Sequence, residues 1–214
     1  MIALPCVVRL ADRPRGHERS VRTLLSIGLL AGLLLLGGCG GDDDAQGGGG
    51  GGGSTSSAPP EGSVEKTGYS FVPPEGWKDA AQAFEGSAIK VDAAYAEPNP
   101  EQGFANNVNI IRETPQGLNA DDFDQYIEEF RRQAGTQAND AGLSETEELE
   151  LDGEPARTWE YEARRNEEPK INQKQVVVIK DDALYTITWT ARQDAFEESK
   201  SDLQGMLDSW RWSG

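Results

Sequence analysis

Histidine and cysteine are almost missing from this sequence. Its 214 residues include one histidine, His17, and two cysteines, Cys6 and Cys39. Ser-His-Asp and Cys-His mechanisms need an imidazole that accepts the proton of the nucleophile, and structural zinc sites are built from Cys and His ligands. All chemistry of these kinds would have to use these three residues, so their place in the chain decides whether it is available.

The sequence also lacks an apolar run long enough to span a bilayer. Its longest run, residues 24–36 (LLSIGLLAGLLLL), has about 13 residues, whereas a membrane-spanning helix needs about 20. The run follows five arginines, an order typical of an export signal. Leu36-Gly37-Gly38-Cys39 comes next and resembles the bacterial lipobox, in which small residues precede a cysteine that receives a diacylglycerol. We therefore expect a lipoprotein signal peptide at 1–38 and lipidation of Cys39. The alternative is an uncleaved hydrophobic stretch that happens to end in cysteine.

Cleavage before Cys39 would remove both His17 and Cys6, and lipidation would turn the remaining thiol into a thioether. The mature chain would then exclude imidazole-dependent nucleophiles, Cys/His zinc sites, c-type haem attachment and disulfides. Catalysis could still use carboxylates, lysine or tyrosine, for example an acid–base carboxylate pair that cleaves glycosides. This hydrolase alternative has little specificity, because so many acidic side chains place some pair at a suitable separation by chance. We expect a protein that is not an enzyme and needs no cofactor.

Residues 40–66 contain almost no apolar side chains. Seven consecutive glycines stand at 47–53, and a Ser/Thr/Pro-rich stretch follows them. Such a segment behaves as flexible coil, because it has no surface to bury against its ordering entropy. About 27 residues of this kind reach roughly 30 Å on average. The sequence therefore predicts a lipidated cysteine and disordered tether at 39–66. The tether would hold a domain at 67–214 near the extracytoplasmic face of the cell membrane.

Basic residues are few. The chain has 20 Lys and Arg against 37 Asp and Glu, a net charge of −17. Without residues 1–38 the balance is 15 basic and 35 acidic residues, or −20. Such a surface repels the phosphates of nucleic acids and of anionic lipids, so nucleic acid is excluded as a partner and the lipid on Cys39 must provide the membrane attachment. We expect a monomer with an envelope protein as its partner. A small ligand or weakly bound divalent cations are the alternative.

Apolar residues beyond about position 64 follow the two periods of regular secondary structure. Alternation predicts strands at 69–72, just after 77, and at 89–95, 108–112, 146–151, 156–163, 171–180 and 184–191. One helix is predicted from an N-cap at Asn119 to a stop near Gly135, and a second from a cap at Asp194 through Asp208. Short turns such as Asp152-Gly153 favour hairpins. We expect an α+β fold, an antiparallel sheet with helices packed on one side of it.

Aromatic side chains are concentrated on the predicted strands and at the C-terminus. They are Trp159, Tyr161, Tyr185, Trp189, Trp210 and Trp212. Large aromatic residues on elements that face one another usually fill a core, and this is the first interpretation. The alternative is that one or two of them line a concave sheet face and bind an apolar or sugar ligand. Trp77 is interpreted in the same way, as a cover on the edge of the core.

Carboxylates gather in two places, Asp121/Asp122/Asp124 and Glu145/Glu147/Glu148/Glu150. We interpret them as helix-end charge and as a solvated strand edge, with weak binding of divalent cations as the alternative. The stretch that starts at Asp42 superficially resembles a calcium loop. Its twelfth position is Gly53, where a bidentate glutamate is required, so no metal ligand is assigned there.

Several of these segments together resemble a known family. They are GYSFVPPEGW at 68–77, VNIIRE at 108–113, DDFDQYIEEF at 121–130, QVVVIKDDALYTITWTA at 175–191 and the closing FEESKSDLQGMLDSWRW. The chain is similar over 68–212 to the PsbP-like family, which includes the extrinsic subunit of photosystem II and many bacterial envelope lipoproteins of unassigned function. The resemblance implies a PsbP-like sandwich that acts as a non-enzymatic module on membrane complexes or partners. It implies no catalytic, cofactor-binding or metal-binding residue.

Overall fold

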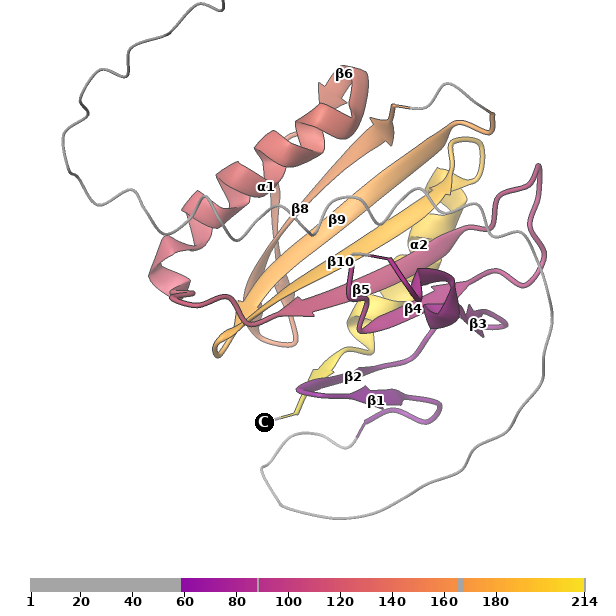
Figure 1. Ribbon diagram of the computed structural model, residues 1–214. Coiled ribbons are helices and arrows are strands. Elements are labelled where there is room, and N and C mark those ends of the chain that lie inside the picture. The colour runs from indigo at the N-terminus through magenta and orange to yellow at the C-terminus, as the bar shows by residue number, and fades with distance from the viewer. Residues whose placement is uncertain (1–58, 88, 165–167, 214) are drawn as a thin grey trace, which may run out of the picture.

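The computed structural model describes residues 59–87, 89–164 and 168–213 (Figure 1). The predicted signal peptide, Cys39 and the calcium-loop-like stretch lie outside these residues. No helix in the described part of the chain is long and apolar enough to cross a membrane.

An eight-stranded antiparallel sheet forms the centre of the domain (Figure 1). Its strands run in the order β3 (Lys78–Asp79), β4 (Ala93–Ala96), β5 (Asn107–Glu113), β10 (Ala183–Arg192), β9 (Ile171–Lys180), β8 (Glu154–Ala163) and β6 (Ala138–Leu143), and β7 (Glu147–Leu151) also pairs with β8. Tight turns join β7 to β8 and β9 to β10. Asp152, Gly153 and Asp181 adopt positive φ there, as such turns require. The predicted hairpins are therefore confirmed.

A smaller sheet joins the two ends of the domain. Strands β1 (Val64–Lys66), β2 (Tyr69–Phe71) and β11 (Arg211–Trp212) pair in the order β1-β2-β11. The first strand occupies residues that sequence analysis placed at the end of the tether. A three-residue strand has too little alternation to be recognised along the chain, and β1 exists because it pairs with β2.

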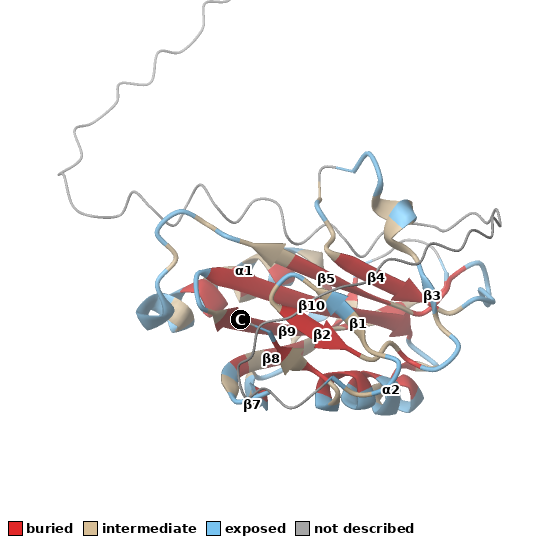
Figure 2. Ribbon diagram, turned by 90° about the horizontal axis from the view of Figure 1, so that it is seen from below, coloured by how far each residue is buried: buried red, intermediate tan, exposed pale blue. Residues whose placement is uncertain are grey.

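The two helices, α1 (Phe123–Gln137) and α2 (Phe196–Asp208), lie on opposite faces of the large sheet, which Figure 2 shows between them. Tyr126 and Phe130 of α1 share a buried cluster with Val177, whereas Phe196 and Leu203 of α2 belong to a different cluster. The α+β class and the antiparallel sheet are confirmed, but the expectation that both helices pack on one side is wrong. An apolar stripe shows that a helix packs on a sheet, and the path of its connections decides on which face.

The ends of some elements differ from the prediction. Asn119 accepts a hydrogen bond from the backbone N–H of Asp121 (3.1 Å) and caps the short 3-10 turn η3 (Ala120–Asp122), from which α1 continues through Gly135. Asp194 does not cap α2. Its carboxylate accepts a bond from Nε of Arg192 (3.1 Å), and Ala195 holds the N-cap position.

The predicted aromatic core is confirmed, because all six aromatic side chains named above are buried. They divide between the two faces of the sheet. Trp159 and Tyr161 lie under α1, and the other four lie on the α2 side. On that side Trp210 stacks on Tyr69, with ring centroids 4.4 Å apart and planes 5° apart.

Candidate functional site

The face of the sheet that carries α1 bears polar side chains at its centre. Thr188 of β10 lies opposite Asn109 of β5 on one side and opposite Gln175 of β9 on the other, and Gln175 lies opposite Trp159 of β8. These four residues, Asn109, Thr188, Gln175 and Trp159, form one line across four strands and are called the polar row. Neighbouring strands are about 4.8 Å apart, so the row is roughly 15 Å long.

The polar row is buried although three of its members have side chains typical of surfaces. The exposed fractions are 0% for Asn109, 3% for Thr188, 2% for Gln175 and 1% for Trp159. Helix α1 lies over the β8 end of this line (Figure 1). Tyr126, Ile127 and Phe130 pack there in one cluster with Trp159.

Four atoms of the polar row have no hydrogen-bond partner. They are Nδ2 and Oδ1 of Asn109, Oε1 of Gln175 and Nε1 of Trp159. A buried polar atom without a partner costs about 1–3 kcal/mol, and native proteins contain few of them. Their burial therefore costs stability, as it does for other unpartnered buried atoms of the described residues, such as Oη of Tyr161 and Nε1 of Trp210.

The next line of the same face is satisfied only in part, because Oη of Tyr161, which lies opposite Gln173, has no hydrogen-bond partner among the described residues. Nε2 of Gln173 donates a hydrogen bond to Oγ1 of Thr190 (3.0 Å), and both side chains are buried. Gln173 and Thr190 are direct partners across β9 and β10, two residues along each strand from Gln175 and Thr188. Glutamine and threonine side chains can thus bond to each other on this face.

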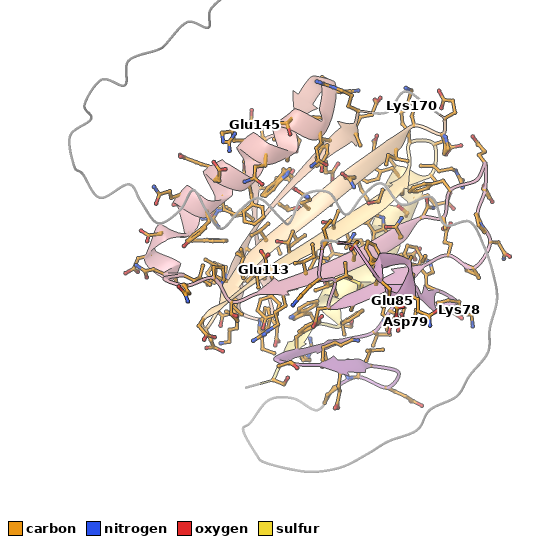
Figure 3. The ribbon with its side chains drawn as sticks, viewed as in Figure 1. Lys78, Asp79, Glu85, Glu113, Glu145 and Lys170 are labelled. Carbon is orange, nitrogen blue, oxygen red and sulfur yellow. The ribbon has the colours of Figure 1, made fainter. Side chains whose placement is uncertain are left out.

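Glu113 brings a carboxylate to the same face. It lies opposite Leu184, which belongs to the α1-side cluster, at the end of β5 (Figure 3). Its side chain is half-buried, and burial raises the pKa of the Glu113 carboxyl above its ordinary value. The charged form is therefore disfavoured in the folded protein.

We expect Glu113→Gln to stabilise the fold at neutral pH, because the amide removes a charge that burial disfavours. The folded pKa of Glu113 lies above the unfolded one, so the protonated wild type carries no such penalty at low pH. The gain in the free energy of unfolding should be greatest above the folded pKa and vanish as the pH falls below the unfolded pKa. Urea unfolding of both proteins across pH 4 to 8 measures this difference. A difference that does not change with pH would contradict the assignment.

The predicted carboxylate clusters are exposed, as a solvated strand edge and helix-end charge require. One carboxylate from each cluster forms an ion pair with Arg157. Asp124 lies 3.5 Å and Glu148 3.2 Å from its guanidinium. No three His, Cys, Asp or Glu side chains in the described ranges are grouped so that they could hold a metal ion. Cys39, the predicted lipidation site, lies outside those ranges.

Sequence analysis missed the polar row. Asn, Gln and Thr alternate with apolar residues on β5, β9 and β10, and in an antiparallel sheet this pattern is typical of a solvent-facing side. One signal was present. The polar residues on this face of the strands are uncharged, for example Asn107, Gln173 and Thr186. Strand faces that are fully exposed usually carry Lys or Glu.

The comparisons with known proteins agree with the fold. The PsbP family model matches residues 63–212. The solution structure of cyanobacterial PsbP (CyanoP) from Synechocystis sp. PCC 6803 is similar at a TM-score of 0.52 and 21% identity, covering 77% of this chain and 98% of that chain. The crystal structure of LpqN, involved in cell envelope biogenesis of Mycobacterium tuberculosis, has a TM-score of 0.49 and 13% identity, covering 68% of this chain and 83% of that chain. Comparison with curated proteins gives no match.

The matched residues run from the first strand of the small sheet to its last, so they contain both sheets and both helices. The resemblance seen in GYSFVPPEGW and the other segments is thereby confirmed. Because the family model covers most of its residues, this protein belongs to the PsbP family.

Proposed function

We propose that this protein is a lipid-anchored accessory module on the extracytoplasmic face of the cell membrane, where it acts by binding and not by catalysis. The observation that carries the proposal is the polar row, whose unpartnered donors and acceptors are suited to noncovalent binding. Its side chains are amides, a hydroxyl and an indole, none of which titrates near neutral pH. Membership of the PsbP family supports the same role.

The anchoring half of the proposal rests on the sequence around Cys39 and on where the domain begins. Strand β1 follows the tether, and Val64 of β1 packs against the cluster on the α2 side of the large sheet. The polar row faces the α1 side. A chain that enters the domain at β1 therefore leads to the α2 side of the sheet, and the α1 side faces away from the point of attachment.

We expect Cys39→Ser to move the protein from the membrane fraction to the soluble fraction of cells. Each lipid CH₂ buried in the bilayer contributes about 0.8 kcal/mol, so loss of the acyl chains removes nearly all the membrane affinity of this acidic protein. Fractionation followed by immunoblotting measures the distribution, and intact-mass spectrometry of the wild type should find lipid on Cys39. A matched control is Ser54→Ala in the tether, which should stay with the membrane.

Retention of Cys39→Ser in the membrane fraction after a high-salt wash would contradict the anchoring half. The binding half is tested by crosslinking in intact cells with a photoreactive residue at Gln82, in the 3-10 turn η2 (Ala81–Phe84), which is exposed. A defined crosslinked product that depends on Asn109 supports binding through the polar row. Crosslinks that are unchanged in Asn109→Leu would contradict a role of the row in binding.

A further inference from the structure

We propose that the outer edge of strand β7 is a docking surface for an extended segment of a partner protein in which basic residues alternate with apolar ones. The segment adds a strand to the large sheet by pairing with β7. The surface is the edge of the sheet and not the polar row, so the inference goes beyond the proposed function and can fail without it.

Strand β7 has a free edge. Among the described residues only β8 pairs with it. Opposite residues of antiparallel strands alternate between pairs that exchange two hydrogen bonds and pairs that exchange none. Glu150 lies opposite Pro155, which has no N–H, so this pair exchanges none, and neither does the next such pair, Glu148 and Arg157. The backbone N–H and C=O groups of Glu148 and Glu150 therefore point outward, and no described residue bonds to them.

The outward groups of β7 lie in a regular line. The strand pairs with β8 over all five of its residues without a shift of register, whereas the pairing of β6 with β8 is irregular. Edges that only need protection from other chains are often bulged, shortened or interrupted by proline, and β7 has charged side chains alone. A straight free edge binds an extended segment through backbone hydrogen bonds, and the side chains beside it select the sequence of that segment.

The two sides of β7 differ in character. Glu148 lies opposite Arg157, which on its other side lies opposite Val177 of the cluster under α1. Glu148 and Glu150 are therefore on the α1 side, and both are exposed. Leu149 between them packs at the rim of the cluster on the α2 side and is half-buried.

This alternation defines the sequence that fits. Side chains directly opposite each other on neighbouring strands interact, and opposite charges stabilise the pairing by about 0.2–1 kcal/mol each. The residues opposite Glu148 and Glu150 should therefore be basic. The residue opposite Leu149 should be apolar, because it extends the rim of the buried cluster.

A second copy of this chain does not fit the same edge. Two β7 strands that pair would bring glutamates beside glutamates, and like charges in opposite positions are destabilising. The net charge of the chain, −17, also repels another copy and attracts a basic segment. The occupant that fits is therefore a basic segment of a different protein.

The first experiment uses the purified full chain in non-ionic detergent and a fluorescent short peptide of alternating lysine and valine. Anisotropy measures binding. In an antiparallel strand the lysines opposite Glu148 and Glu150 donate their backbone N–H groups to β7, and the valines point theirs away. N-methylation of the lysine backbone should therefore abolish binding, whereas N-methylation of the valine backbone should leave it unchanged. Equal binding of the two methylated peptides would mean attraction by charge alone and overturns the proposal, as does failure of the unmodified peptide to bind.

The second experiment locates the binding on the protein. Glu148→Gln with Glu150→Gln should weaken binding about tenfold, since two favourable charge pairs are lost. The matched control, Glu198→Gln with Asp202→Asn on the exposed side of α2, removes the same charge and should leave the affinity unchanged. Urea unfolding should give both double variants the stability of the wild type, because all four side chains are exposed. An equal loss of affinity in the two double variants overturns the proposal.

Hydrogen exchange measured by nuclear magnetic resonance tests the backbone contact directly. The amide hydrogens of Glu148 and Glu150 should exchange more slowly when the peptide is bound, because they become hydrogen-bonded. Exchange at these two amides that is the same with and without bound peptide excludes β7 as the docking edge.

Discussion

Trp210→Ala should lower the free energy of unfolding by about 3–5 kcal/mol, as for other buried tryptophans. Trp210 is 0% exposed and stands between α2 and β11. Its ring stacks on Tyr69 at 4.4 Å and Phe71 at 5.8 Å and meets the edge of Trp212 at 5.3 Å. Removing it leaves a cavity at the junction of the small sheet and the large one. Since the free energy of unfolding of a whole domain is only about 5–15 kcal/mol, the variant should be close to unfolding at 37 °C.

Trp77→Ala is the matched control for that prediction. Trp77 stacks on Trp189 at 4.8 Å, but it is only half-buried and lies at the rim of the same cluster. We expect its loss to cost about 1–2 kcal/mol. Urea unfolding followed by far-ultraviolet circular dichroism measures both variants. If both variants lost the same free energy of unfolding, then the aromatic stack at Trp210 would not hold the two sheets together.

Gly68→Ala should cost about 2–4 kcal/mol, because two penalties coincide at this turn between β1 and β2. The backbone of Gly68 has φ of +91°, which L-residues rarely adopt. An added Cβ would also lie 2.7 Å from Oη of Tyr185. That oxygen accepts a hydrogen bond from Nε of Arg112 (3.1 Å) and belongs to a buried ring, so it cannot move away freely.

Gly76→Ala carries only one of these two penalties. Its φ is +79°, similar to that of Gly68, but no atom lies within 4 Å of the added Cβ. We expect it to cost about 1–2 kcal/mol, the value of the left-handed backbone alone. The comparison of the two alanine variants by urea unfolding isolates the contact with Tyr185. A Gly68→Ala variant as stable as Gly76→Ala would show that the turn moves away from Tyr185 without cost.

The long elements could be predicted along the chain. Strand β9 was predicted with its observed bounds, β10 to within one residue at each end, and α2 with its last residue at Asp208. These segments are long enough to show a clear period, and their turns contain Asp and Gly residues that tolerate positive φ. The pieces that were missed, β1, β6 and β11, are short or irregular. They are strands because a partner lies beside them, as the shift of register between β6 and β8 illustrates.

The candidate site could not be predicted in the same way. Asn109, Gln175 and Thr188 are 66 and 13 residues apart in the sequence, and only the pairing of β5, β9 and β10 puts them in one line. The local alternation predicts that their side chains share one face of the sheet. A polar face of an antiparallel sheet is usually exposed to solvent. They are buried, and the Asn109 amide and Oε1 of Gln175 lack partners, whereas Gln173 and Thr190 bond to each other. These features depend on the pairing of distant strands, which no local pattern contains.

Features that depend on neighbours in the chain were therefore accessible without a structure: the antiparallel hairpins, the helices, the family resemblance and the predicted lipidation of Cys39. Each arises from residues within a few positions of one another, where periodicity, turn chemistry and short motifs operate. The side of the sheet on which each helix packs, the joining of β1 and β11 through β2, and the unpartnered polar row arise from contacts between distant segments. Such contacts depend on register and packing, and the alternation of a strand is the same whichever partner it finds.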